Sequence, residues 1–82
     1  MEIIPGNGFD EAQQEYLNRL ITETEAAEIL HYTIRALQNW RLRGGGPKFI
    51  KVSSRSIRYR RCDLFAWSEE RMVSHTSEAT VA

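Results

Sequence analysis

Amide and guanidinium side chains gather between residues 33 and 43, where they could bond the edges of nucleic-acid bases. Gln38 and Asn39 are adjacent, and Arg35 precedes them by about one helical turn. Gln and Asn can each form two hydrogen bonds with adenine in the major groove of DNA, and Arg can do so with guanine. These residue types predict a base-reading surface, which requires a helix to carry it.

A block of positive charge surrounds these residues. From residue 31 to residue 62 the chain has nine Lys or Arg residues and no Asp or Glu. Residues 1–30 have seven acidic residues against Arg19, and residues 63–82 have four against Arg71, so the formal net charge is zero. Like charges repel one another, and a polyanion outside the protein would relieve that repulsion. A solvated basic face without a ligand is the alternative interpretation of the block taken alone.

Two short helices are predicted, over residues 23–30 and about 33–42. Thr22 and Glu25 have the spacing of a capping box at the start of the first helix. Thr33 has the side chain of an N-cap for the second helix. The predicted core face of the second helix carries Ile34, Leu37 and Trp40. Its predicted outer face carries Arg35, Gln38, Asn39 and Leu42.

A hairpin is predicted after the second helix, because three consecutive glycines and Pro47 end that helix. Two apolar runs, 49–52 and 57–59, flank the four polar residues 53–56, and the whole hairpin extends over about 49–60. The predicted inner face consists of Ile50, Val52, Ile57 and Tyr59. The predicted outer face consists of Lys51, Arg58 and Arg60.

The remaining residues divide the chain into four parts: a flexible tail (1–9), an accessory helix (10–19), a main domain (20–73) and a disordered tail (74–82). A third helix is predicted to open at Asp63, with Leu64 and Trp67 on its core side. Cys62 is the one cysteine of the chain, so no internal disulfide is expected. His31 and His75 lie too far from Cys62 and from each other to predict a metal site.

An ordered series of short motifs extends through the main domain. They are LITETEAAEIL (20–30), RAL (35–37), WR (40–41), GP (46–47), FIK (49–51), RYRR (58–61), DL (63–64) and Trp67. Through them, residues 20–72 resemble the small MerR-like winged helix-turn-helix domains of the phage excisionase and AlpA-type regulator family. The resemblance implies a mainly α fold with a small β-hairpin, here extended by the N-terminal helix.

The same resemblance implies that the helix at 33–42 enters the major groove and that the basic wing at 49–60 contacts the DNA backbone or the minor groove. Three positions depart from the family pattern. His31 replaces a glycine between the two helices, Cys62 replaces a serine that caps the third helix, and Phe65 replaces a polar residue on that helix. Histidine tolerates a left-handed conformation less well than glycine, so an altered turn is expected at His31.

The predicted function is sequence-specific binding of double-stranded DNA, as an excisionase-like recombination directionality factor or as a transcriptional regulator. The residues predicted to contact DNA are Thr33, Arg35, Gln38, Asn39, Arg41, Arg43, Lys51, Arg55, Arg58 and Arg60. Further predicted partners are an integrase or recombinase, or a second copy of the chain on adjacent DNA sites. No catalytic motif, metal, cofactor or small-molecule ligand is predicted.

Several alternatives remain open from the sequence. A protein-interaction accessory module would use the basic face, or a strip formed by Phe65 and Met72. Trp40 and Trp67 could stack on bases, although their spacing favours core packing. Arg43 could contact phosphate or complement the helix dipole. The start of the chain has no signal-peptide pattern and no apolar run long enough to span a bilayer, so a cytoplasmic, nucleoid-associated protein is expected.

Overall fold

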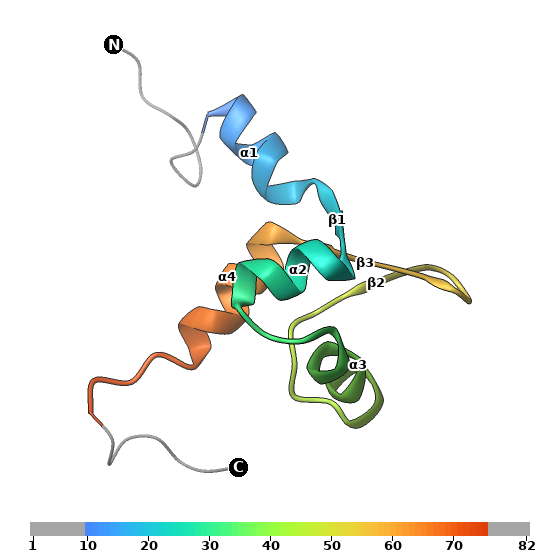
Figure 1. Cartoon of the computed structure of the whole chain (residues 1–82). Helices are drawn as coiled ribbons and strands as arrows, with labels where there is room; N and C mark the ends of the chain where they lie inside the picture. Colours follow the sequence, from blue (N-terminus) through green and yellow to red (C-terminus); the bar gives the residue numbers. More distant parts are fainter. Residues whose placement is uncertain (1–9, 76–82) are drawn as a thin grey trace.

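The computed structural model describes residues 10–75, which form four helices and a three-stranded antiparallel sheet (Figure 1). In chain order the elements are α1 (Glu11–Asn18), β1 (Leu20–Thr22), α2 (Glu23–Leu30), α3 (Ile34–Arg43), β2 (Ile50–Ser53), β3 (Ser56–Arg60) and α4 (Arg61–Glu70). The strands lie in the order β1-β3-β2. Among these residues, no helix combines the length and the apolar character needed to cross a bilayer. The predicted tail 1–9 and residues 76–82 of the second predicted tail lie outside the described residues.

The predicted accessory helix is present as α1. The Asp10 side chain accepts a hydrogen bond from the Gln13 backbone N–H at 2.8 Å, and the Gln13 side chain accepts one from the Asp10 N–H at 3.1 Å. α1 buries none of its own residues. It is held by Arg61, whose guanidinium lies 4.0 Å from the centre of the Tyr16 ring and donates to the Tyr16 carbonyl at 3.1 Å. The accessory helix is therefore attached to the beginning of α4 in the same chain.

The sequence-based prediction contains only the β2–β3 hairpin, and the additional strand β1 was not predicted. Ile21 of β1 pairs with Tyr59 of β3, and the two side chains are 2% and 1% exposed. A strand of three residues is too short to show an alternating pattern, and its partner lies far along the chain. Local sequence therefore gives no indication of β1, and burial of Ile21 against Tyr59 stabilises it instead.

The turn between α2 and α3 has the predicted caps. Thr22 and Glu25 form the capping box. The Glu25 N–H donates to the Thr22 hydroxyl at 3.1 Å, and the Thr22 N–H donates to the Glu25 carboxylate at 2.9 Å. The bond from the Thr22 backbone holds the pKa of Glu25 below its usual value. The Thr33 hydroxyl accepts a bond from the Ala36 N–H at 3.0 Å and starts α3. Between them His31 adopts the left-handed conformation, with φ 56° and ψ 45°.

The predicted faces of the hairpin are wrong in part. Ile50 pairs directly with Arg58, and Lys51 pairs directly with Ile57. Residues that pair directly across antiparallel strands point to the same face of the sheet. Ile50 therefore lies on the face of Arg58, whereas Lys51 lies on the face of Ile57 and Tyr59.

The turn explains this error in register. Ser53 pairs with Ser56, so the loop consists of Ser54-Arg55 alone instead of the predicted four residues. The register then shifts between Lys51 and Ser53, which leaves the exposed Val52 as an extra residue in the strand. A shift of one residue moves the side chains of a strand to the opposite face.

The core lies where α2, α3, α4 and the sheet meet. Its buried side chains are Ile21, Ala26, Ala27, Leu37, Tyr59 and Leu64. Trp40 packs against this cluster, with its ring 5.0 Å from that of Trp67 and stacked 5.2 Å from that of Tyr32. These contacts favour core packing over base stacking for both tryptophans. Ile34, predicted on the core face of α3, is exposed.

α4 begins two residues before the predicted start. Its N-cap position is Arg60, which makes no capping bond through its side chain. Cys62 therefore lies in the first turn of the helix and not at the cap, as the sequence had indicated. Its thiol donates to the Asn18 side-chain oxygen at 3.4 Å, which adds a third contact between α1 and α4.

The glycine-rich loop after α3 is attached to α4. Gly44 and Gly45 have φ angles of 91° and 95°, which favour glycine. Trp67 and Arg71 both donate to the Gly45 carbonyl, at 2.9 Å and 2.6 Å. A Cβ on Gly46 would lie 2.5 Å from the Trp40 Cβ, so no other residue fits there without a shift. The loop thus fixes where the chain leaves α3 and enters the hairpin.

His31 supplies a test of this fold. We expect His31→Gly to raise the free energy of unfolding by up to about 1 kcal/mol, because glycine adopts positive φ without steric strain. His31→Val should lower it by about 1–2 kcal/mol, because a β-branched residue tolerates this conformation poorly. Chemical denaturation measures both. A valine variant as stable as the wild type would contradict the left-handed conformation of this residue.

Candidate nucleic-acid interface

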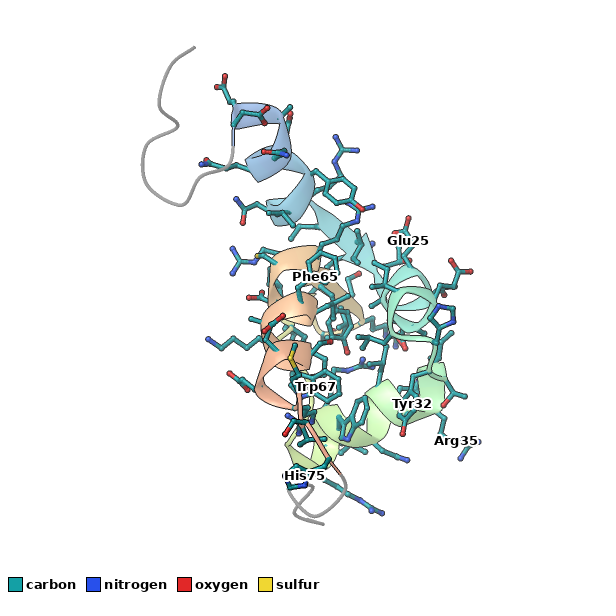
Figure 2. All side chains as sticks on the ribbon, turned by 90° about the vertical axis from the view of Figure 1, so that its left-hand side faces the viewer. Glu25, Tyr32, Arg35, Phe65, Trp67 and His75 are labelled. Atoms are coloured by element: carbon teal, nitrogen blue, oxygen red, sulfur yellow. The ribbon has the colours of Figure 1, made fainter. Side chains whose placement is uncertain are left out.

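The exposed side of α3 is the surface on which the base-reading residues were predicted. Arg35, Asn39 and Leu42 are all exposed and recur every three or four residues, so they share the helix face opposite the buried Leu37. Figure 2 shows Arg35 pointing away from the body of the molecule. Gln38 flanks this face and is also exposed. α3 and α1 lie at opposite ends of the molecule, so this face is remote from the accessory helix (Figure 1).

Five of the nine basic residues between positions 31 and 62 have no partner among residues 10–75. All five are exposed, and none forms a hydrogen bond or ion pair through its charged side-chain group with the described part of the chain. They are Arg35, Arg43, Lys48, Lys51 and Arg55. They begin on α3, continue through the loop after it and end at the tip of the hairpin. Their charges are therefore available to an external anion.

Arg55 and Lys51 place two of these charges on the hairpin. Arg55 belongs to the two-residue loop, where its backbone N–H donates to the Ser53 hydroxyl at 3.4 Å and its side chain stays exposed. Lys51 lies on β2, on the sheet face of Ile57. Lys51 is thus exposed, as predicted, but it lies on the opposite face of the sheet from the one predicted.

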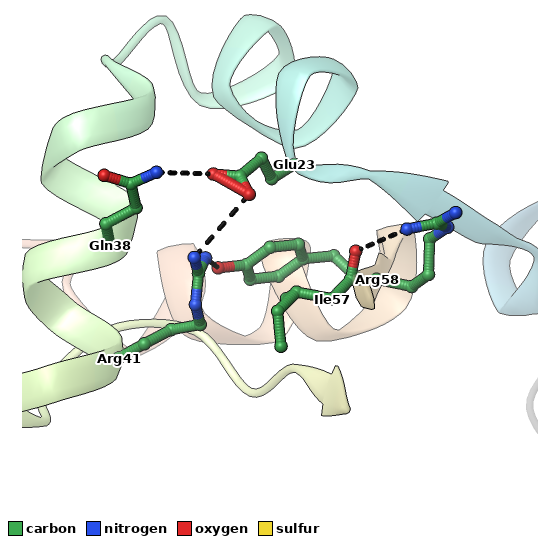
Figure 3. A network of polar contacts seen from close by, with 6 residues as sticks. Glu23, Gln38, Arg41, Ile57 and Arg58 are labelled. Carbon is green, nitrogen blue, oxygen red and sulfur yellow. Dashed lines mark hydrogen bonds and ion pairs between the residues drawn. The ribbon is translucent and has the colours of Figure 1, made fainter. Parts of the chain in front are cut away.

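Arg41 has a different place from the one predicted. Its guanidinium donates to the Tyr59 hydroxyl at 2.7 Å and forms an ion pair with Glu23 at 3.6 Å (Figure 3). Only 16% of the Arg41 side chain is exposed. The residue joins α3 to β3 and to the start of α2, so its guanidinium is used inside the protein and does not belong to the exposed basic surface. Helical spacing could have revealed this, because Arg41 follows the core residue Leu37 by four positions.

Tyr59 shows the electrostatic consequence of that contact. Burial raises the pKa of the Tyr59 phenol above its ordinary value, because the phenolate would lose its hydration. The hydrogen bond from Arg41 opposes this effect without cancelling it. The phenol is therefore held neutral, and its oxygen accepts the bond from Arg41.

Arg58 and Arg60 were predicted to point outward to DNA, and the structure gives both internal partners. The Arg58 guanidinium donates to the Ile57 carbonyl at 2.9 Å. Arg60 donates twice to Asp63, at 2.9 Å and 3.3 Å, and this bonding raises the pKa of its guanidinium. Both residues are only partly exposed. Arg60 joins the end of β3 to the start of α4, Arg58 bonds within β3, and neither belongs to the five unpaired cations.

The two predicted amide readers differ in their surroundings. The Gln38 amide donates to the second carboxylate oxygen of Glu23 at 3.4 Å (Figure 3). Asn39 is exposed and its amide has no partner among the described residues. The Thr33 hydroxyl serves as the cap of α3, at the helix end that favours anions. The sequence pattern did not indicate Glu23, because both of its partners, Gln38 and Arg41, belong to a different helix, α3.

The strip predicted from Phe65 and Met72 is not continuous. Phe65 lies on α4, whereas α4 ends at Glu70 and Met72 follows the helix. Both side chains are exposed. A spacing of seven residues gives one stripe only while the helix continues, so these two residues do not form the predicted helical anchor.

No protein-family model matches this chain, and no curated protein is significantly similar to it. Function is therefore inferred from the geometry and charge of the chain itself. The strongest geometric feature is the separation of the basic residues into an internal set and an exposed, unpaired set.

The neutral phenol of Tyr59 predicts an alkaline loss of stability. A raised pKa in the folded protein stabilises it below the pKa of the unfolded state, about 10, and this contribution is lost as pH rises above that value. Tyr59→Phe should remove this part of the pH dependence. At neutral pH the free energy of unfolding of the variant should be lower by about 1–3 kcal/mol, because the Arg41 guanidinium loses an acceptor. Urea denaturation at neutral pH and above pH 10 measures both effects. If the stability of the wild type and of Tyr59→Phe fell equally with rising pH, Tyr59 would not be the source of the alkaline loss.

Proposed function

We propose that the protein binds double-stranded DNA as a winged helix-turn-helix domain. The observation that supports it is the exposed series of unpaired cations from α3 to the hairpin tip, in a stretch of chain without acidic residues. Such a series concentrates positive charge along one path, as a protein that follows a phosphate backbone requires. We propose a binding protein and not an enzyme, with no cofactor.

In this proposal α2 and α3 are the helix-turn-helix, and α3 enters the major groove. An α-helix fits that groove, and the outward face of α3 offers a guanidinium at Arg35 and an amide at Asn39. The first backbone N–H groups of α3 have no partner within the helix and would face a phosphate. Thr33 contributes indirectly, as the cap that fixes this helix end.

The β2–β3 hairpin is the wing. Its short loop carries Arg55 between small serine residues, so the guanidinium can approach a phosphate or enter a minor groove. Lys51 and Lys48 extend the contact back toward α3. Arg43, at the last turn of α3, connects the two parts, and its lack of a carboxylate partner favours phosphate contact as its role.

The resemblance to phage excisionases and AlpA-type regulators supports two biological roles. The first is a recombination directionality factor that acts with an integrase or recombinase, and the second is a transcriptional regulator. Either role is compatible with a second copy on an adjacent DNA site and with association with the nucleoid. The order of the elements α2, α3, hairpin and α4 is compatible with this kind of domain.

The affinity should fall steeply with salt. Contact of the five unpaired cations with about five phosphates gives a log–log slope of about −4 to −5 for binding against salt concentration. Fluorescence anisotropy with a random duplex between about 50 and 200 mM salt measures the slope. A slope near zero, or no binding at low salt, would contradict the proposal and would favour an acidic protein as the partner of the basic face.

Variants that remove one charge each show which residues contribute to the salt dependence of binding. Arg35→Ala and Arg55→Ala should each weaken binding to all duplexes and reduce the slope by about 0.9. The matched control is Arg19→Ala, because Arg19 is an exposed arginine at the end of α1, remote from α3. The control should keep the wild-type slope. An equal loss in all three variants would show that net charge alone governs binding.

Sequence reading should depend on the amides. Asn39→Ala should weaken the binding free energy by about 1–3 kcal/mol on a site selected from a random library. The loss on a scrambled duplex should be small, since only the selected site supplies the base that bonds the amide. Gln38→Ala should cost less, because the Gln38 amide already bonds Glu23 in the free protein. Competition titrations measure these differences. Equal losses on both duplexes would move specificity to DNA shape or to the hairpin.

A further inference from the structure

Leu42 is the most exposed large hydrophobic residue among residues 10–75. Its exposed fraction is 85%, against 58% for Val52 on the hairpin. It lies in the last turn of α3, and it makes no contribution to the core cluster. A single exposed leucine is ordinary on a protein surface, so exposure alone says nothing about a ligand.

The position of Leu42 gives the second observation. Asn39 precedes it by three residues, Gln38 by four and Arg35 by seven, and these spacings place all of them on one side of α3. Each of these neighbours is polar and exposed. Leu42, at 85% exposed against 36% for Ile34 at the start of the helix, is therefore the most exposed apolar side chain of α3 in the surface that the proposed function directs into the major groove.

The major groove presents one kind of apolar group at its floor, the C5-methyl group of thymine. The other groups that distinguish the bases there are hydrogen-bond donors and acceptors, and a leucine side chain cannot form hydrogen bonds with them. We propose that Leu42 selects thymine by packing against this methyl group. The inference rests on the proposed function, and it names one base that the site reads.

The helix geometry sets where this thymine lies. Four residues of an α-helix advance about 6 Å, so Leu42 is about 6 Å further along α3 than Gln38. Successive bases on a strand are about 3.4 Å apart. The thymine should therefore lie one or two base pairs from the base that Asn39 or Gln38 reads.

The experiment replaces thymine with deoxyuridine, one position at a time, in a duplex selected from a random library. Each replacement removes a methyl group and leaves every hydrogen-bonding group in place. We expect one position at which the wild-type protein loses about fourfold in affinity, as for one buried methyl group. At that position Leu42→Ala should bind the two duplexes equally. The matched control Leu20→Ala, which truncates an exposed leucine on β1 outside α3 and the hairpin, should keep the wild-type discrimination.

Each other outcome overturns the inference in a recognisable way. No deoxyuridine effect at any position means that no methyl group is read, while salt-dependent binding would still support the proposed function. A deoxyuridine effect that persists in Leu42→Ala assigns the methyl contact to another residue. A change of oligomeric state in Leu42→Ala without any deoxyuridine effect assigns Leu42 to a protein contact. Absence of all duplex binding at low salt overturns the proposed function itself. Thermal melting should show that Leu42→Ala folds normally, because the side chain is exposed.

Discussion

The hydrogen bond between Arg41 and Tyr59 joins three parts of the structure at one point. Tyr59 is buried in the core on β3, and its ring packs 6.3 Å from that of Phe49. Arg41 reaches it from α3 and also pairs with Glu23 at the start of α2. The orientation of α3 relative to the sheet therefore depends on a polar contact at the edge of the core. Because the phenol and the guanidinium satisfy each other, that contact can be covered without an unpaired polar group.

The Arg41 contact is one example of how the basic block is divided. Three of its nine residues, Arg41, Arg60 and Arg61, join elements within the chain, and a fourth, Arg58, bonds the carbonyl of its neighbour Ile57 within β3. The five others are left exposed and unpaired on α3, the loop and the hairpin. A count of charges along the sequence cannot separate these sets, because both contain the same residue types. The division reduces the number of phosphates that the surface can neutralise, and so it limits the salt dependence to about half of what the whole block would give.

The loop between α3 and β2 carries the second constraint on the proposed surface. Trp67 and Arg71 of the α4 region hold the Gly45 carbonyl, and the ring of Trp40 leaves no room for a side chain at Gly46. The hairpin therefore starts from a fixed point next to the end of α3. A groove-reading helix and a backbone-following hairpin can act together only if their relative position is fixed before binding, since ordering them on DNA would cost conformational entropy.

The sequence by itself determined the features that depend on near neighbours. These include the capping box of Thr22 and Glu25, the Thr33 cap, the glycine-rich stop after α3 and the exposure of Arg35, Asn39 and Arg55. Each depends on interactions over a few residues, which spacing and residue type reveal.

Only the tertiary structure decided the strand β1, the register of the hairpin and the internal roles of Arg41, Arg58 and Arg60. The partners of β1, Arg41 and Arg60 lie in other elements, the Arg58 guanidinium bonds the backbone carbonyl of Ile57, and the turn is two residues shorter than predicted. Ile21 becomes a strand residue because Tyr59 buries it, and the hairpin faces follow from one extra residue at Val52. A contact between distant residues, or a shift of a single residue in register, leaves no periodic pattern in the local sequence, because its energy comes from burial and pairing in the folded chain.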